Sequence, residues 1–252
     1  MPSNDPVSME AFANLTDAIL TGRDFTGVDF THANLTRANL TKANLEHADL
    51  TDASLTGASL TGAWLTGAKL IDSDLTHANL AHANLTGADL TDADLTDATL
   101  GYADLTDANL REANLTRTYL NGTNFTKANL TFANLEDINL TDVKLTGANL
   151  THAGLSGVDL SGAKLTRAKL RYADLSHANL TDADLTRANL KEANLCYAVL
   201  FGANLTRAKL TGADLTDAFL HGANLTGANL DGADLTDVKW DETTIDPDGW
   251  LK

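Results

Sequence analysis

The chain has 252 residues, with 34 Asp or Glu and 18 Lys or Arg, and its formal net charge of −16 at pH 7 disfavours non-specific binding to nucleic-acid phosphates or to an anionic membrane. The single cysteine, Cys196, excludes an intramolecular disulfide framework and a cysteine-cluster metal site. No apolar run approaches the roughly 18–20 residues that span a membrane, and the N-terminus lacks a basic-then-apolar leader, so a cytoplasmic protein is expected.

Residues 1–12 precede a long repeat and are expected to form its N-terminal cap. Pro2 and Pro6 favour irregular backbone, and Met9 and Phe12 could cover the open end of the first repeat units. A cap is needed because such an end exposes both apolar surface and an unpaired strand edge.

The repeat has a period of five and is expected to span residues 13–239. From residue 15 to residue 235, every residue number divisible by five is Leu or Phe. This period fits neither a helix nor a regular strand. Within one unit, Ala33 and Leu35 are two positions apart and face one side of an extended segment, whereas Asn34 and Thr36 face the other. The fifth residue must then turn the chain, so each unit is one side and one corner that buries its apolar face against its neighbours.

These tandem A(D/N)LxX units resemble the pentapeptide-repeat proteins over roughly residues 13–239. The resemblance implies an all-β fold, a right-handed quadrilateral β-helix with four units per coil, without loop insertions. The Leu or Phe and the small Ala would lie inside. The units would make about eleven coils and, at roughly 4.8 Å per coil, a rod on the order of 50 Å long. Examples of the inward central residues are Leu35, Leu40, Leu45, Leu50, Phe125 and Leu130.

Several residues inside the repeat depart from its pattern, among them Ser73 at a small-residue position. Arg23 takes a small-residue position, and its head group is expected to reach solvent because a charge is costly in a dry core. Thr118 and Thr123 replace Ala in neighbouring units, which predicts either local widening of the coil or ordinary drift of the repeat.

Residues 240–252 are expected to form the C-terminal cap. Trp240 and Ile245 continue the five-residue period, and Pro247 begins a turn before Trp250. The two tryptophans and Ile245 are predicted to plug the end of the core. The segment is too short for the helical dimerisation element that some members of the resembled family carry.

The outer surface is expected to show vertical stacks, because residues twenty apart lie above one another when a coil has twenty residues. One stack is acidic and could imitate a nucleic-acid backbone or simply keep the rod soluble. Together with two flanking aspartates, it comprises Asp49, Asp52, Asp72, Asp89, Asp92 and Glu112. The same face becomes basic towards the C-terminus with Lys169, Arg171, Lys191 and Lys209, and the preceding face stacks Arg167, Arg187 and Arg207. This change of sign could support head-to-tail contacts or an acidic partner.

An apolar patch is predicted near the C-terminal end of the rod. Val199, Phe201 and Phe219 occupy outward positions on one face, and Tyr197 occupies the corner before it. Contiguous apolar surface often marks an interface. The sequence therefore predicts a protein-binding site here, for a partner of unknown identity or for a second copy in a homodimer.

The sequence offers no catalytic, cofactor-binding or metal-binding constellation. His77 and His82 lie one corner apart, but no Cys or carboxylate set completes a metal site around them. No serine lies in a nucleophile elbow, and no glycine loop has phosphate-binding spacing. A smooth rod also lacks the deep pocket that a substrate needs. A non-enzymatic protein without a cofactor is expected.

Two functions remain open at this point. The first is a structural or protein-interaction scaffold. The second is an acidic DNA mimic, because some pentapeptide-repeat relatives bind DNA gyrase and confer fluoroquinolone resistance. Those relatives typically dimerise through a C-terminal element, and several carry loops that contact the enzyme. This sequence has neither feature, so the scaffold is the preferred interpretation.

Overall fold

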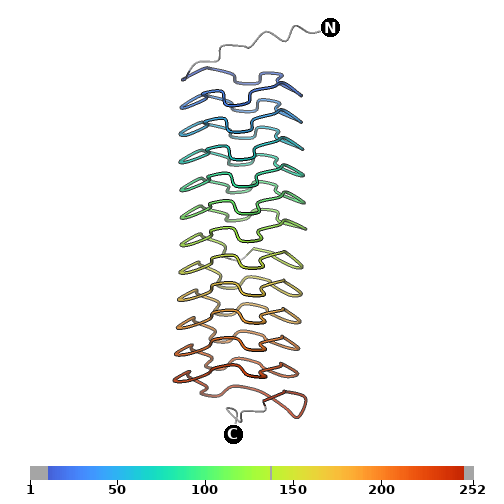
Figure 1. Cartoon of the computed structure of the whole chain (residues 1–252), viewed down its shortest axis with the longest axis vertical. Coiled ribbons are helices and arrows are strands. Elements are labelled where there is room, and N and C mark those ends of the chain that lie inside the picture. Colours follow the sequence, from blue (N-terminus) through green and yellow to red (C-terminus); the bar gives the residue numbers. More distant parts are fainter. Residues whose placement is uncertain (1–10, 137, 247–252) are drawn as a thin grey trace.

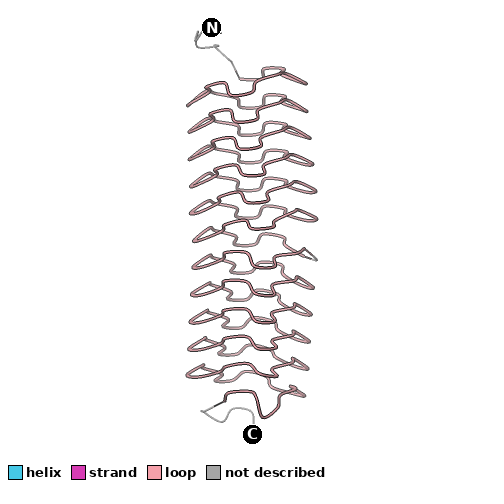
Figure 2. Cartoon of the chain, turned by 90° about the vertical axis from the view of Figure 1, so that its right-hand side faces the viewer, coloured by secondary structure: helices cyan, strands magenta, loops and turns pink. Residues whose placement is uncertain are grey.

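The computed structural model describes residues 11–136 and 138–246, and these form an elongated rod of stacked coils (Figure 1). Parallel bridges join residues twenty apart, from Asn14 and Asn34 at one end to Phe219 and Lys239 near the other. Within the described residues there is no helix or continuous strand, because each side contributes one bridge residue flanked by turns (Figure 2). The fold is the predicted right-handed quadrilateral β-helix.

Among the described residues, the repeat corners have the geometry of type II turns. The N–H of the small residue bonds to the preceding central carbonyl, as from Ala18 to Leu15 at 3.0 Å. The residue at the tip of the turn has positive φ, for example 57° at Asp17 and 54° at His32. Type II turns require this conformation, which costs a non-glycine residue about 1 kcal/mol or more. Bonds to the next coil, such as Asp17 N to Thr36 O at 3.0 Å, help to hold these residues in place.

The same turn explains why Asn or Asp precedes the central residue and why Thr comes after it. Asn14 Oδ1 accepts the Thr16 N–H at 3.3 Å and the Thr16 hydroxyl at 2.8 Å, which caps the corner locally. Where the residue is Asn, its amide can also reach the coil before. Asn109 Nδ2 donates to Thr91 Oγ1 at 2.7 Å. The A(N/D)LT pattern therefore satisfies polar groups within and between coils.

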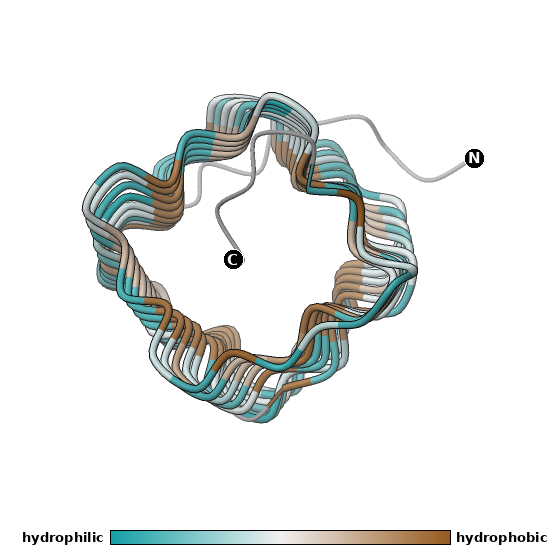
Figure 3. Ribbon diagram, turned by 90° about the horizontal axis from the view of Figure 1, so that it is seen from below, coloured by the Kyte–Doolittle hydropathy of each residue, from teal (hydrophilic) through white to brown (hydrophobic). Residues whose placement is uncertain are grey.

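The core lies on the rod axis and consists of the central Leu or Phe and the paired Ala, which line the inside of the ring in Figure 3. All six central residues given above are fully buried. Burying one such leucine stabilises the fold by roughly 1.5–3 kcal/mol. Arg23 is exposed, as predicted, and Ser73 is accommodated because its hydroxyl donates to Leu70 O at 2.7 Å.

The two threonines that replace alanine are buried in the core. Thr118 Oγ1 donates to Leu115 O at 2.7 Å, and Thr123 Oγ1 donates to Leu100 O at 2.9 Å, so both buried hydroxyls are satisfied. One coil further on, Tyr119 and Asn139 do not form the parallel bridge that their register calls for. We call this interruption of the stack the seam.

The two ends differ from the predicted caps. Phe12 does not cover the core, because it already forms a repeat corner, stacks on His32 at 4.7 Å and remains 72% exposed. The coil therefore includes residues 11 and 12. At the other end, Asn224 bridges to Ile245 and not to residue 244, so Ile245 is one position out of register.

The extra residue at the C-terminal end arises from a turn at residues 241–244. Thr244 N–H bonds to Asp241 O at 3.0 Å, and Asp241 Oδ1 accepts the Thr243 N–H at 3.0 Å. Ile245 consequently occupies an outward bridge position and is 50% exposed, so its predicted role as a plug is wrong. Trp240 is half exposed, whereas Met9 and Trp250 lie outside the described residues.

Candidate interaction surfaces

The four corners divide the rod into four faces (Figure 3). Two of these faces carry the predicted site residues. Face B carries the bridge column that contains Asp49, Lys69 and Asp89. Face D carries the bridge column that contains Val199 and Phe219. These two columns are ten residues, or half a coil, apart in sequence, so faces B and D lie on opposite sides of the rod.

The structure brings Val199, Phe201 and Phe219 together on face D, with Tyr197 at the adjoining corner. Val199 and Phe219 are parallel bridge partners, so their outward side chains lie one above the other. The ring of Phe201, which is 41% exposed, meets Phe219 edge to face at 6.1 Å between centroids. Tyr197, at the adjoining corner, is 48% exposed and stacks on His177 at 5.0 Å.

His221 extends this patch and was not predicted as part of it. Its ring lies 5.3 Å from that of Phe201, and its Nδ1 atom is buried without a hydrogen-bond partner among the described residues. The sequence signal was available, because His221 lies twenty residues after Phe201. The result is a mixed aromatic surface with a buried polar atom inside it.

The acidic column, Asp52, Asp72, Asp92 and Glu112, occupies successive tips of one corner, and all four residues are exposed. The two flanking aspartates lie beside it on face B and are partly buried. Asp89 accepts hydrogen bonds from Thr91 Oγ1 at 2.6 Å and from Asn109 Nδ2 at 3.0 Å.

Lys69 interrupts this acidic surface. It stands between Asp49 and Asp89 in the same bridge column, and its Nζ atom lies 2.9 Å from Asp49 Oδ2. Partial burial raises the pKa of Asp49, but hydrogen bonds from Thr51 and Lys69 outweigh it and lower the pKa overall. Lys69 therefore offsets part of the negative charge that the flanking aspartates give to face B.

Aromatic side chains follow the acidic column along the same corner. The next three tips along the same corner are Phe132, His152 and Tyr172, whose rings stack face to face at 4.8 Å between successive centroids. Arg171 lies beside this aromatic stack and donates to Tyr172 Oη at 2.8 Å. One corner therefore carries four carboxylates followed by three aromatic rings.

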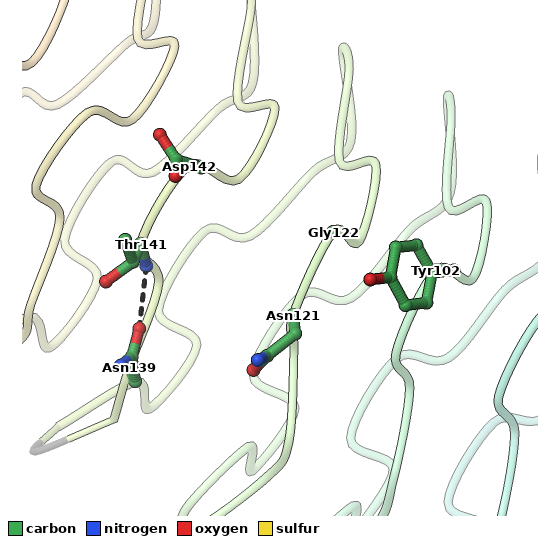
Figure 4. Close-up of a pocket in the computed structure, with 6 residues that line it drawn as sticks. All are labelled: Tyr102, Asn121, Gly122, Asn139, Thr141 and Asp142. Atoms are coloured by element: carbon green, nitrogen blue, oxygen red, sulfur yellow. Dashed lines mark hydrogen bonds between the residues drawn. The ribbon is translucent and has the colours of Figure 1, made fainter.

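An open pocket of about 400 Å³ lies at the seam (Figure 4). Its lining is polar and includes Tyr102, Gly122, Asn139 and Asp142. Asn139 Oδ1 is engaged by the Thr141 N–H at 2.8 Å, as the dashed line in Figure 4 shows. The residues that line the pocket include no His, Cys or Lys.

The histidine and cysteine side chains that could take part in chemistry contact other groups of the rod. His77 lies 4.0 Å from Asp97, whereas His82 stacks on Tyr102 at 5.3 Å. Burial, with the carboxylate of Asp214, raises the pKa of the Cys196 thiol to about 11, which makes it a poor nucleophile. Within residues 11–136 and 138–246, no group of three His, Cys, Asp or Glu could hold a metal ion. Those same residues include no helix long and apolar enough to cross a membrane.

The coil geometry and the five-residue pattern define a β-solenoid. The family described as pentapeptide repeats matches the sequence in eight copies, some of which overlap, between residue 11 and residue 239. The matched stretches are 11–46, 33–70, 73–111, 103–142, 144–182, 163–202, 178–217 and 203–239. The chain belongs to the pentapeptide repeat family.

Several solved structures are similar to this chain, whereas comparison with the curated proteins gives no match. HetL, from the cyanobacterium Nostoc sp. strain PCC 7120, is described as involved in the regulation of heterocyst differentiation. It is 39% identical over 77% of this chain and 87% of its own, with a TM-score of 0.46. Rfr23, from the cyanobacterium Cyanothece 51142, is 29% identical over 48% of this chain and 90% of its own, with a TM-score of 0.34. QnrB1, a plasmid-mediated fluoroquinolone resistance protein, is 19% identical over 91% of this chain and 90% of its own, with a TM-score of 0.31.

Proposed function

We propose that this protein is a non-enzymatic, cytoplasmic scaffold that binds a protein partner through the apolar patch on face D. The observation that carries the proposal is the stacking of Val199 on Phe219 at outward positions, with the Phe201 ring against Phe219. Such a contiguous patch on a highly charged rod is typical of an interface. Aromatic side chains are also the residues that most often dominate binding energy in interfaces.

The shape of the rod supports binding over catalysis. The described coils keep a register of twenty residues up to Lys239, so no inserted loop covers a face or builds a deep cleft. The seam pocket lacks paired acid and base side chains. Flat faces of this kind suit contact with another protein more than enclosure of a small molecule.

Quantitative affinity capture tests the proposal. Wild-type protein, Phe219→Asp and Trp64→Asp would be compared as baits in a lysate of the source organism. Trp64 is the matched control, because it is an exposed aromatic residue, at 57%, in a bridge column of another face. A specific partner should be lost with Phe219→Asp and retained with Trp64→Asp. Equal recovery by all three baits would contradict a role for the patch.

The alternative function is an acidic DNA mimic that binds DNA gyrase, and the acidic column from Asp52 to Glu112 favours it. QnrB1 supplies a related fold with a fluoroquinolone resistance function. Against this reading, the acidic surface is interrupted by Lys69 and followed by aromatic rings.

A supercoiling assay with purified gyrase, with and without a fluoroquinolone, separates the two functions. The scaffold proposal predicts neither inhibition nor drug protection at micromolar concentrations of the protein. Inhibition or protection that disappears in an Asp72→Asn/Asp92→Asn variant would establish the DNA mimic instead.

A further inference from the structure

The charge on face B changes from negative in its N-terminal half to positive in its C-terminal half. Its bridge column runs, one coil at a time, through Asp29, Asp49, Lys69, Asp89, Asn109, Asn129, Asn149, Lys169, Asn189, Lys209 and Asn229. Asn129 is the midpoint of this series. At equal distances on either side of it, Asp89 matches Lys169 and Asp49 matches Lys209.

The same reversal appears when the two corners that bound face B are included. The outward carboxylates of its N-terminal half are Asp29, Glu46, Asp49, Asp52, Asp72, Asp89, Asp92, Asp107 and Glu112, against the three cations Lys69, Arg111 and Lys127. The outward cations of its C-terminal half are Arg167, Lys169, Arg171, Arg187, Lys191, Arg207 and Lys209, against the two carboxylates Glu192 and Asp231. The face as a whole is therefore nearly neutral, on a protein whose net charge is −16.

The middle of face B is polar, uncharged and internally ordered. Asn129 Nδ2 donates to Asn109 Oδ1 at 2.8 Å, and Asn149 Nδ2 donates to Asn129 Oδ1 at 3.4 Å. Phe132, at the neighbouring corner, is 50% exposed and stacks on His152. The two halves of opposite charge thus meet across a flat amide strip with an aromatic ring at its edge.

We propose that face B binds face B of a second copy of this chain, with the two rods antiparallel. The two-fold axis would lie in the interface, perpendicular to the rods, and pass beside Asn129. An axis in this direction places every column opposite itself and inverts its order. Asp89 then lies opposite Lys169, and the Asp49–Lys69 pair lies opposite Lys209 and Asn189. Contacts of this kind are isologous and close as a dimer.

At the corner tips beside the bridge column, where Phe132 is the midpoint, Asp92 comes opposite Tyr172 and next to Arg171. Asp72 comes opposite Glu192, whose charge is offset by Lys191 at 3.4 Å. A parallel two-fold arrangement would instead set carboxylates beside carboxylates and cations beside cations. The charge pattern therefore selects the antiparallel orientation.

Several of these cations are available for a partner. Among the described residues, Lys169 and Lys209 are exposed and form no ion pair. Arg171 has its Nε atom buried without a hydrogen-bond partner, and its guanidinium lies 4.8 Å from the centre of the Tyr172 ring. Holding the guanidinium beside this ring reduces the entropy that a new contact would cost.

A charge-exchange experiment tests the dimer. Sedimentation velocity would be run on wild type, Asp92→Arg, Arg171→Asp and the double variant, at about 0.05 M and about 0.5 M NaCl, which differ strongly in charge screening. Wild type should dimerise more weakly at the higher salt. Each single variant should weaken the dimer by about tenfold or more, and the double variant should recover most of the loss.

The substitutions are chosen to preserve the coil. Arginine already occupies corner tips at Arg37 and Arg117, and aspartate already follows a central leucine at Asp231. Within one chain, residues 92 and 171 are about four coils, or roughly 19 Å, apart. Recovery in the double variant would therefore arise between chains. A circular-dichroism melt of each variant verifies that it is folded.

The outcomes are decisive in both directions. Monomers at both salt concentrations, or a dimer that both single variants leave unchanged, would overturn the proposal. A double variant no better than the single variants would also overturn it. Phe219→Asp, on the opposite face, should leave the dimer intact while removing the partner proposed above. A dimer lost with Phe219→Asp would assign self-association to face D instead.

Discussion

Asp74 accepts the hydroxyl of Thr56, in the preceding coil, at 2.7 Å while its other carboxylate oxygen caps its own turn. Partial burial raises the pKa of Asp74, but the hydrogen bonds from Thr56 and Thr76 outweigh this effect, and the pKa is lowered overall. Asp184 shows the same arrangement with Thr166 and Thr186, and its pKa is also lowered. The carboxylates of the repeat therefore stabilise the stacking of the coils in their ionised form.

This arrangement predicts loss of stability in acid. Because the folded pKa of Asp74 lies below its unfolded value, its contribution is fully present above about pH 4 to 5 and is lost as pH falls through the folded pKa. Asp74→Asn should make the free energy of unfolding less dependent on pH below about pH 4. Urea titrations at several pH values measure this.

The control for that experiment is Asp72→Asn. Asp72 is exposed, and its carboxylate has no hydrogen-bond partner among the described residues. The control should follow wild type at every pH. If Asp74→Asn and Asp72→Asn behave alike, hydrogen bonding between coils is not the source of the acid sensitivity.

A charged residue placed in the buried core should strongly destabilise the fold. Leu130 is fully buried on the rod axis, so Leu130→Asp places an unpaired charge among leucines. We expect destabilisation of more than about 4 kcal/mol and loss of cooperative thermal unfolding. Asn134→Asp, at an outward bridge position, should change stability by less than about 1 kcal/mol. Thermal denaturation followed by circular dichroism distinguishes them, and an unchanged melt for Leu130→Asp would refute the inward assignment.

The stability lost when a corner glycine is replaced by alanine should depend on the neighbouring side chains. A Cβ atom at Gly122 would meet the Tyr102 ring at 2.7 Å, whereas one at Gly87 would have no neighbour within 4 Å. Both residues have positive φ, so Gly→Ala should cost about 1 kcal/mol at either position. Gly122→Ala should cost more, because the Tyr102 ring must also move. Equal losses of stability in chemical denaturation would contradict this account.

Local opening should concentrate at the seam. Leu100 N–H bonds to Tyr119 O at 2.8 Å and Tyr102 N–H to Asn121 O at 2.9 Å, but Leu120 and Gly122 lack the equivalent bonds to the following coil. Amides without such bonds exchange readily with solvent. Hydrogen exchange measured by mass spectrometry should therefore be faster at Leu120 and Gly122. Uniform protection along the rod would show that the stack is continuous there.

Much of this architecture could be predicted from the sequence, because one physical rule repeats without interruption. The alternation of Ala33 and Leu35 with outward Asn34 and Thr36 fixes which side chains are buried. A register of twenty then places Val199 under Phe219 and aligns the acidic column. Each of these conclusions depends only on position within the repeat.

The remaining features depend on geometry that the period does not contain. Ile245 keeps the five-residue spacing, but the turn stabilised by Asp241 adds a residue to its coil. Tyr119 and Asn139 keep the twenty-residue spacing, but they form no parallel bridge. Counting carboxylates also overlooked the ion pair by which Lys69 breaks the acidic surface.

The most direct test of the central claim, that the rod acts as a scaffold through face D, is the ratio of each captured protein between wild type and Phe219→Asp. Quantitative mass spectrometry with Trp64→Asp as the control measures this ratio. The account predicts at least one protein that is depleted about tenfold or more with Phe219→Asp and unchanged with Trp64→Asp. Proteins recovered equally by all three baits, or none above the level of empty beads, would contradict it.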